Sequence, residues 1–428
     1  MSERKFKITN PYESVTELLG KKENHYKTNL HTHSTVSDAA VNFNDIVKEY
    51  YKHGFDILAM TEHGIIGRRW DEKPEEIPLY YHQYILGRSK TPLTAFEMDE
   101  IEDGTRPAPE YARRVPGRGM HCLTGGIELN MVTLTKSHVN GFFCDFGTNN
   151  WGFENGYLYA VRKVHEHGGI SFINHPGDWL HAHKNVANAH DIGNIRRFGD
   201  IFLKYPSCVG TEICNRVCGD SKNDRIFWDE LIRYVVPHGS RNVFGFANSD
   251  AHALSDVNTS FEDFILPGFS HENMRTAMEN GTFFAVSRYA RNELGEDFKA
   301  NDLPYPRCLD IKVDEKKGTI TVKCENTDKI EWIADGKVIK ADTKKAKNGT
   351  VSSKLTLADF ENDISCYVRF QMLGEGGASF SQPFILDDGN LDRFIIADTR
   401  TDKEKIKERI VFNLKSMRVP VLVKVLTK

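Results

Sequence analysis

Short apolar runs alternate with longer amphipathic stretches from about residue 28 to about residue 290. Tyr26–Leu30 and Asp56–Met60 have the composition of buried strands, and Phe43–His53 between them has the apolar spacing of a helix. The same pattern predicts further strands at Met120–Leu129, Val139–Cys144, Gly169–Ile173, Cys208–Ile213 and Asn242–Ala247, and further helices at Glu154–His167, Asp224–Val236 and His271–Asn280. Such β-then-α repeats indicate an α/β fold on a parallel sheet, either open or closed into a barrel.

A polar stretch from Arg68 to Gly119, rich in proline, glycine and arginine, interrupts this alternation. Insertions of this length in a compact domain are commonly lids or substrate loops. Arg113, Arg114 and Arg118 could therefore cover an active site, although a solvated loop would have the same composition.

After about residue 300 the pattern changes to short strands separated by turns. The predicted strands are Leu309–Val313, Thr319–Cys324, Ile330–Ala334, Lys337–Ile339, Ser352–Leu357, Ser365–Met372 and Ser379–Leu386. Asp335-Gly336 is typical of a hairpin, because both central residues of such a turn have positive φ. This density of strands predicts a small all-β immunoglobulin-like sandwich over residues 305–387, after a first domain at residues 1–300. The sandwich contains no histidine, and we expect it to fold separately and to supply no catalytic group.

Cys324, Trp332 and Cys366 resemble the Cys…Trp…Cys core of an immunoglobulin domain, but their spacings are short for it. We therefore expect both cysteines to be small core residues rather than a disulfide. Residues 388–428 form a C-terminal extension, in which Thr401 and Glu404 predict a capping box at the start of a helix. The apolar run Val419–Leu426 then predicts a final strand.

The overall composition is that of a globular protein, with 39% hydrophobic and 27% charged residues among 428. A net charge of -4 opposes a broad nucleic-acid surface, although a local basic pocket is compatible with it. No run approaches the roughly 20 apolar residues of a membrane helix, and no signal peptide begins the sequence. Eight cysteines lack CxxC spacing, which argues against a zinc ribbon and favours a cytoplasmic location with reduced thiols.

Histidines and carboxylates gather at the predicted strand ends. His31-Thr32-His33 follows the first strand, and residues i and i+2 of a strand point to the same face. Alone, this pair is weak support for a metal site. The pattern recurs, however, in Glu62-His63, Glu128, His138, His175 and Asp250-Ala251-His252, with Asp38 after the first pair. Because the carboxyl ends of barrel strands face one active site, we expect these residues to hold metal ions.

The motif series HTH…D, EH, E, H, NHP and SDAH resembles the PHP (polymerase and histidinol phosphatase) superfamily over roughly residues 25–290. The resemblance implies a distorted (β/α)7 barrel that holds two or three divalent transition-metal ions, either zinc, manganese or iron. By position, it implies that the first ion is bound by His31, His33, Glu128 and Asp250. The same resemblance implies that Glu128 bridges to a second ion with His138 and His175, and that Asp38, His63 and His252 bind the third.

Two further features qualify this resemblance. The family usually has aspartate before the second-motif histidine, whereas this chain has Glu62, and that change puts the orientation of His63 in doubt. The sandwich strands around Tyr367–Phe370 and Gln382–Ile385 make the domain organisation look like the CehA/McbA-like branch of the family.

We expect a metal-bridging hydroxide to cleave a small phosphomonoester or phosphodiester. Arg216 could bind the phosphate, although a solvated surface arginine would have the same sequence context. His181 or His183 could act as a general acid or as an outer metal ligand. The alternatives are a hydrolase of an amide, ester or carbamate that uses the same metals, and a non-catalytic PHP module. The expected partner is a small phosphorylated substrate, not a nucleic-acid polymer or a membrane, and a homo-oligomer is compatible with the sequence.

Overall fold

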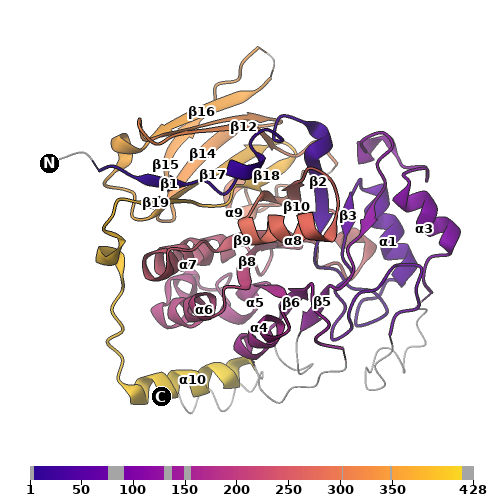
Figure 1. Cartoon of the computed structure of the whole chain (residues 1–428), viewed down its shortest axis with the longest axis horizontal. Coiled ribbons are helices and arrows are strands. Elements are labelled where there is room, and N and C mark those ends of the chain that lie inside the picture. The colour runs from indigo at the N-terminus through magenta and orange to yellow at the C-terminus, as the bar shows by residue number, and fades with distance from the viewer. Residues whose placement is uncertain are drawn as a thin grey trace.

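A computed structural model describes residues 4–75, 91–129, 137–148, 156–300, 302–347 and 349–416. Strands and helices are mixed throughout the first 300 residues, and strands dominate the remainder (Figure 1). The sheets of the later residues lie across one side of the molecule, with α6 (Ile192–Lys204) and α7 (Asp224–Gly239) packed beneath them. The chain is therefore a mixed α/β protein with an all-β part.

The first arc of strands carries the amino-terminal histidine motif. β2 (His25–Asn29), β3 (Ile57–Leu58) and β4 (His121–Cys122) are parallel neighbours, and β10 (Ser260–Ile265) and β11 (Phe283–Ser287) extend the sheet with antiparallel pairing. The helix α1 (Phe43–Lys52) follows β2, close to its predicted bounds, and buries its apolar face against these strands.

The second arc has five strands in sequence order. They are β5 (Ile127–Leu129), β6 (Val139–Phe142), β7 (Ile170–Ile173), β8 (Cys208–Asn215) and β9 (Phe244–Asn248). Only β7, β8 and β9 are parallel, because β6 runs antiparallel to both β5 and β7. The predicted parallel repeat is thus wrong for β5 and β6, and Met120–Leu129 is two strands, separated at Gly125 with its φ of 81°.

Helices cover the outside of the second arc. α4 (Tyr157–Glu166), α6 and α7 bury an apolar core against it, α8 (His271–Asn280) precedes β11, and α5 (Pro176–Leu180) and α9 (Arg291–Leu294) are short. The helices at Phe43, Asp224 and His271 begin where the sequence predicts them. Sequence periodicity did not predict α6 or β10.

The two arcs meet at single bridges located at strand ends. Thr32 pairs with Ala251 and His63 pairs with Glu128, each in parallel register. Backbone amides reinforce both contacts, since His33 N–H donates to Ala251 O and Gly64 N–H donates to Glu128 O. The motifs that contain histidine thus form the seams between the two arcs.

The all-β part consists of two sheets with one apolar core between them. One sheet is β12 (Arg307–Asp314), β13 (Thr319–Glu325) and β16 (Val351–Thr356), and the other contains β14 (Lys329–Ala334), β15 (Lys337–Asp342), β17 (Tyr367–Gly374), β18 (Gly377–Phe380) and β19 (Phe384–Asp387). Cys324, Trp332 and Cys366 are buried, and both cysteines are unpaired, as predicted. The hairpin at Asp335-Gly336 has the predicted positive φ at both residues.

The backbone hydrogen bonding does not stop near residue 300. β18 pairs with β11, so one sheet runs from β2 into the sandwich, and β1 (Lys7–Thr9) pairs with β19 near the other end of the chain. The apolar residues Phe6, Ile8 and Tyr12 also lie in the sandwich core. These shared strands and this shared core oppose the expectation that the sandwich folds separately.

A buried ion pair joins the two parts through α7. Arg369 on β17 donates from Nε and Nη2 to the two oxygens of Asp229, at 2.8 and 2.7 Å. Tyr367 donates its hydroxyl to the same carboxylate at 2.8 Å. Both charged side chains are almost fully buried, so removal of either leaves an uncompensated charge.

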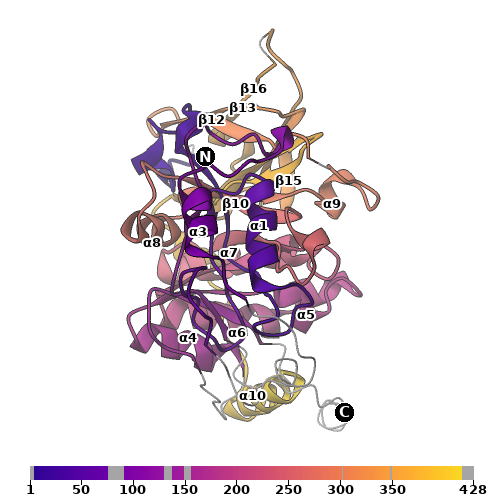
Figure 2. The ribbon, with the colours of Figure 1, turned by 90° about the vertical axis from the view of Figure 1, so that its right-hand side faces the viewer.

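The described part of the Arg68–Gly119 insertion packs on α1. α3 (Ala95–Glu102) begins at the capping box of Thr94 and Glu97, and its Met98 and Ile101 share a core with Trp70 and α1. Figure 2 shows α1 and α3 side by side. The described residues of the insertion therefore form a side layer of the fold.

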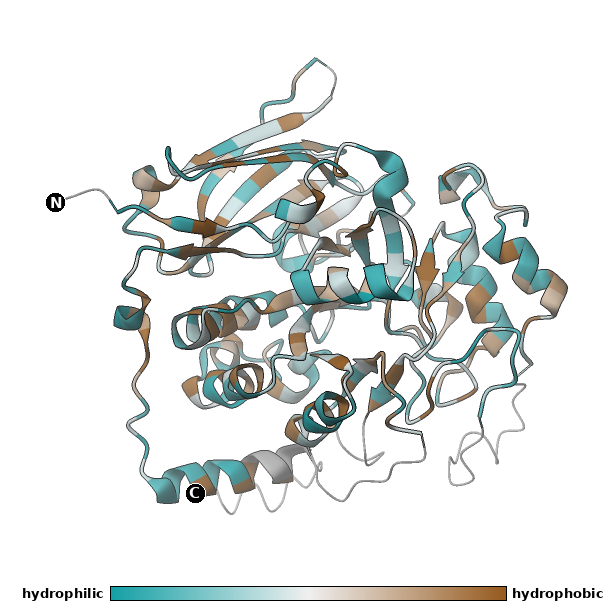
Figure 3. Ribbon diagram, in the orientation of Figure 1, coloured by the Kyte–Doolittle hydropathy of each residue, from teal (hydrophilic) through white to brown (hydrophobic). Residues whose placement is uncertain are grey.

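The helix α10 (Asp402–Ser416) lies at the edge of the molecule and is mostly hydrophilic (Figure 3). The predicted capping box is confirmed, because Thr401 N–H donates to Glu404 Oε2 at 2.7 Å and Glu404 N–H donates to Thr401 Oγ1 at 3.3 Å. The predicted strand Val419–Leu426 lies outside the described residues. None of the helices in the described ranges is long and apolar enough to cross a membrane.

We predict that Asp229→Ala lowers the free energy of unfolding by about 3–5 kcal/mol, because it leaves the Arg369 guanidinium buried without its carboxylate. Urea denaturation monitored by circular dichroism measures the change. Arg233→Ala on the same helix is the control, since its pair with Glu230 is partly exposed and contributes less than about 1 kcal/mol. Equal losses from the two substitutions would contradict the role given to this ion pair.

Candidate metal centre

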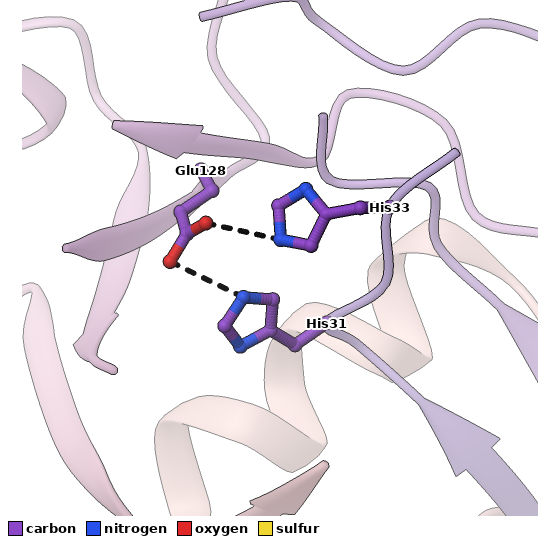
Figure 4. A group of neighbouring side chains, drawn as sticks. All are labelled: His31, His33 and Glu128. Atoms are coloured by element: carbon purple, nitrogen blue, oxygen red, sulfur yellow. Dashed lines mark ion pairs between the residues drawn. The ribbon is translucent and has the colours of Figure 1, made fainter. Parts of the chain in front are cut away.

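The predicted ligands come together at the seams between the two arcs. His31 and His33 follow β2, Glu128 lies in β5, His138 precedes β6, and His175 follows β7. Figure 4 shows both imidazoles of the first motif pointing at the Glu128 carboxylate. His31 and His175, 144 positions apart, thus share one buried site around Glu128, because the strand ends that carry them converge.

The Glu128 carboxylate is the centre of this cluster. Its Oε1 lies 3.2 Å from His31 Nε2, 3.1 Å from His138 Nδ1 and 3.5 Å from His175 Nε2. Its Oε2 lies 3.1 Å from His33 Nε2 and 3.0 Å from His63 Nδ1. The two oxygens therefore face different sets of imidazoles, and Glu128 belongs to more than one close group of potential ligands.

Asp250 completes the group around the first motif. Its Oδ1 lies 3.3 Å from both His31 Nε2 and His33 Nε2. Neither nitrogen makes a hydrogen bond within the described part of the chain, although both are buried. Atoms that ligate one ion at about 2.1 Å lie about 3.0–3.4 Å from one another. The spacing and the missing hydrogen bonds therefore suit a cation between these side chains.

A third group lies toward the solvent. Asp38 Oδ2 is 3.4 Å from His63 Nε2, and Asp38 Oδ1 is 3.4 Å from His252 Nε2. Close groups of three potential ligands also include His33 with Asp38 and His63, and His33 with Asp250 and His252. His63 faces Glu128 with one ring nitrogen and Asp38 with the other, so it connects this group to the centre.

Several residues of the site have left-handed backbone conformations. The φ angle is 23° at His175, 40° at Asp250 and 50° at Arg216. Non-glycine residues in this region carry a cost of about 1–3 kcal/mol, and such residues are concentrated at functional sites. Backbone hydrogen bonds hold two of them, from Asp250 N–H to His31 O and from Arg216 N–H to Asn248 O.

Glu212 supports the site, and the sequence analysis gave it no role. Its Oε1 accepts a hydrogen bond from His31 Nδ1 at 2.9 Å, and its Oε2 accepts one from the His175 backbone N–H at 2.8 Å. A histidine that donates from Nδ1 presents its Nε2 lone pair to an ion. The signal that could have identified it is a carboxylate near the end of the strand Cys208–Asn215, where the other strands carry the predicted ligands.

Glu62 positions the first motif rather than His63. Its carboxylate accepts hydrogen bonds from the backbone N–H groups of Ser34 and Ser37, each at 3.1 Å, and from both serine hydroxyls. Ser37 Oγ in turn lies 3.3 Å from His33 Nδ1. The replacement of aspartate by Glu62 therefore bears on the loop that carries His33.

Arg216 lies beside the cluster. Its Nε donates to Asp250 O at 2.9 Å and lies 3.5 Å from Asp250 Oδ2, its Nη2 contacts His252 Nδ1, and its side chain is 40% exposed. His252 Nδ1 is also 2.9 Å from Asp250 O, and donation to that oxygen leaves Nε2 as the ligand atom. Arg216 is thus placed between the cluster and the solvent.

The other predicted substrate residues are arranged differently. His183 Nε2 lies 3.1 Å from Asp220 Oδ1, and its ring lies 6.2 Å from that of His181. Arg114 donates to Phe55 O, and Arg118 donates to His25 O at the start of β2. The metal ligands follow the opposite end of that strand.

Arg113 belongs to the same end as its two neighbours, since it donates to Asp302 O and Tyr111 O. The expectation that these three arginines cover the active site is therefore wrong. The reason is that residues 95–119 pack along α1 toward the starts of β2 and β3 rather than across their ends.

The pKa values of the cluster are strongly shifted when no cation is present. Burial alone would lower the pKa of His31. The carboxylates of Glu128, Asp250 and Glu212 outweigh this effect and raise that pKa well above its usual value. The same balance of burial and carboxylates raises the pKa of His175 to about 9. Burial also opposes ionisation of Glu128 and Asp250, yet the imidazoles hold both carboxyl pKa values well below their usual range.

No protein-family profile matches the chain, and no curated protein matches it. Similar solved structures include a two-domain protein of Bacteroides vulgatus that contains a predicted PHP-like metal-dependent phosphoesterase, at 14% identity, 89% of this chain, 99% of that chain and a TM-score of 0.41. PsfC of Pseudomonas syringae has 14% identity, 59% and 88% coverage of the two chains and a TM-score of 0.34. The lesion-specific endonuclease EndoQ of Pyrococcus furiosus has 14% identity, 60% and 56% coverage and a TM-score of 0.32. Likenesses this distant carry no information on the substrate of this chain.

We predict that chelator-treated protein loses stability as the pH rises from 6.5 to about 9. A group whose pKa is raised by folding stabilises the fold below its unfolded value, and this contribution disappears as the pH passes the folded value. For His175 these values are 6.5 and about 9. Urea denaturation at several pH values measures the trend.

His175→Gln should reduce this pH dependence, whereas His190→Gln, at an exposed surface pair, should leave it unchanged. A metal-free chain that becomes more stable over this range, with His175→Gln following the same curve, would contradict the assignment.

Proposed function

We propose that this chain is a metal-dependent hydrolase of the PHP superfamily and that it cleaves a phosphoester. The observation that carries the proposal is the buried Glu128 carboxylate, which lies within 3.5 Å of five imidazoles. Buried ionic groups are costly unless they are paired or bind metal. A purely structural core has no need of so many imidazoles around one carboxylate.

The nine side chains fit two or three divalent ions of the kind that nitrogen and oxygen ligands prefer. Zinc, manganese and iron all accept such mixed sets, and no cysteine belongs to the nine. By the positions of the family motifs, His31, His33, Glu128 and Asp250 would hold one ion. Glu128 with His138 and His175 would hold a second, and Asp38, His63 and His252 a third. Bound ions of this kind lower the pKa of coordinated water and polarise a phosphoryl oxygen.

The residues of the chain supply position and charge around this chemistry. Glu212 holds His31 in one orientation, and Glu62 holds the loop of His33 and Asp38. Arg216 brings a guanidinium to the solvent side of Asp250, where it can donate to the oxygens of a phosphate. These fixed groups act on the substrate without rearrangement, which is the main source of electrostatic catalysis.

The exposure of the cluster supports a small substrate. His31, His33 and Glu128 are buried, whereas Asp38 and His252 are about one-third exposed, so a substrate reaches the site from the Asp38 side. A net charge of -4 offers no broad basic surface for a polymer. A small phosphomonoester or phosphodiester fits this access.

We expect metal-loaded protein to hydrolyse nitrophenyl phosphate or bis-nitrophenyl phosphate faster than long single-stranded DNA or a carbamate ester. Steady-state rates with zinc, manganese and iron in turn provide the measurement. Arg216→Ala should raise KM for the phosphoester about tenfold, the loss expected for about 1.4 kcal/mol of charged hydrogen bonding.

Turnover of the carbamate alone would remove the chain from the phosphoesterases. A clear preference for DNA would refute the small substrate while leaving the metal site intact.

His175→Ala and Asp250→Ala should each lower metal content and reduce kcat at least about a hundredfold, more than the loss of an outer-shell partner causes. Elemental analysis and activity assays at saturating metal test both effects. His190→Ala is the matched control, because this histidine is exposed and pairs with Glu230 at the surface. Wild-type metal content in both ligand variants would refute the assignment of these residues.

A further inference from the structure

A second polar site lies at the other end of β2, far from the metal centre. It is a cavity of about 280 Å³ between the starts of β2 and β3, the described insertion and the segment that leads into the sandwich. Lys27 of β2 lines it, whereas His31 follows the opposite end of that strand, four residues or about 13 Å away. The cavity is thus separate from the proposed hydrolase site.

Positive charge dominates the described lining of this cavity. Six of its residues are lysine or arginine, and three are aspartate or glutamate. Arg307 and Glu325 form a pair with each other, and Asp56 lies 3.7 Å from Arg118. Asp302, the third acid, accepts a hydrogen bond from Asn258 Nδ2 at 3.2 Å and lies 3.4 Å from His53 Nδ1. Within the described residues, none of the three acids forms an ion pair with the deeper cations of the cavity.

Lys27 is one of these deeper cations. Its Nζ donates to His53 O at 2.7 Å and to Asn258 Oδ1 at 2.6 Å, and it lies 4.3 Å from the centre of the Phe55 ring. No ion pair joins Lys27 to a carboxylate within the described ranges of the chain. The ammonium group has a third N–H available for another acceptor.

Arg288 is the second deep cation and shares the same neutral acceptor. Its Nε donates to Asn258 Oδ1 at 3.1 Å, and its Nη1 donates to Leu303 O at 2.7 Å. The described contacts include no carboxylate at this guanidinium and no partner for Nη2. The neutral Asn258 amide thus contacts both buried cations through its oxygen, and its Nδ2 donates to the Asp302 carboxylate at 3.2 Å.

Burial of a charge costs several kcal/mol per ion unless an opposite charge compensates it. Two such cations beside a cavity favour an anion in that cavity, within reach of Lys27 Nζ and Arg288 Nη2. Arg113 lines the more exposed side of the same cavity, next to Asp302. Its charge adds to the attraction for an anion that enters from solvent.

The volume restricts the kind of anion. At roughly 30 Å³ per water molecule, 280 Å³ exceeds what inorganic phosphate needs. It is close to the lower end of the roughly 300–1,000 Å³ found for small-molecule sites. Tyr111, whose ring lies 5.5 Å from that of His53, provides an aromatic wall for an organic group.

We propose that this cavity binds a small organic anion through a phosphate or carboxylate group held by Lys27 and Arg288. The site does not depend on the proposed hydrolase chemistry, because it shares no residue with the metal centre. Both charged groups offer the same chemistry to the two cations, and direct binding measurements distinguish them.

The test is isothermal titration of the full chain, with the metal centre emptied by chelator, against glucose 6-phosphate, citrate and uncharged glucose. Wild-type protein should bind one equivalent of glucose 6-phosphate or citrate, more weakly as salt is added, and should not bind glucose. Whichever anion binds more tightly identifies the charged group that the site prefers.

Lys27→Met and Arg288→Gln should weaken this binding at least tenfold, and circular dichroism shows whether each variant folds. Arg113→Ala changes an exposed side chain and should weaken binding severalfold even if the buried variants fail to fold. Arg216→Ala, beside the metal centre, should leave the titration unchanged.

Three results would overturn the proposal. One is the absence of saturable binding of either anion to the wild-type chain. Another is equal binding by wild type, Arg113→Ala and every folded variant of Lys27 or Arg288. The third is loss of the titration in Arg216→Ala, which would place the anion at the metal centre.

Discussion

One buried carboxylate in contact with five imidazoles lies where the two arcs of strands meet. Glu128 is almost completely buried, and in a medium of low polarity its charge is tolerated only because His31, His33, His63, His138 and His175 surround it. Those histidines come from both arcs of the sheet. The two arcs therefore approach each other at this point, where the backbones of His63 and Glu128 form a parallel β-bridge.

Much of this site was predictable because its ligands occupy repeated positions. A histidine or carboxylate at each strand end is a local pattern, and local patterns also gave the bounds of α1 and α8, the Asp335-Gly336 hairpin and the Thr401 capping box. The convergence of the motifs was predicted from parallel strand ends, and it holds although β6, which follows His138, pairs antiparallel with its neighbours.

The features that the sequence did not predict depend on contacts between residues that are remote in sequence. Nothing near Glu212 shows that its carboxylate meets His31, 181 positions earlier, on the other arc of strands. The antiparallel pairing of β6 and the hydrogen bonds from β18 to β11 are likewise choices of neighbour, which residue spacing does not encode. The prediction for the arginines of the Arg68–Gly119 insertion failed for a similar reason. Arginines that bind backbone carbonyls and arginines that bind substrate have the same local sequence.

The pairing of β1 with β19 has a consequence for biosynthesis. Lys7 finds its partner at Asp387, roughly 380 residues later, and a ribosome that adds about 5–20 residues each second needs on the order of 20–75 s to reach it. During that interval the apolar side chains of Phe6 and Ile8 have none of the sandwich core that later buries them. β1 is thus made long before the strand that pairs with it, and it is completed in space only when the sandwich is.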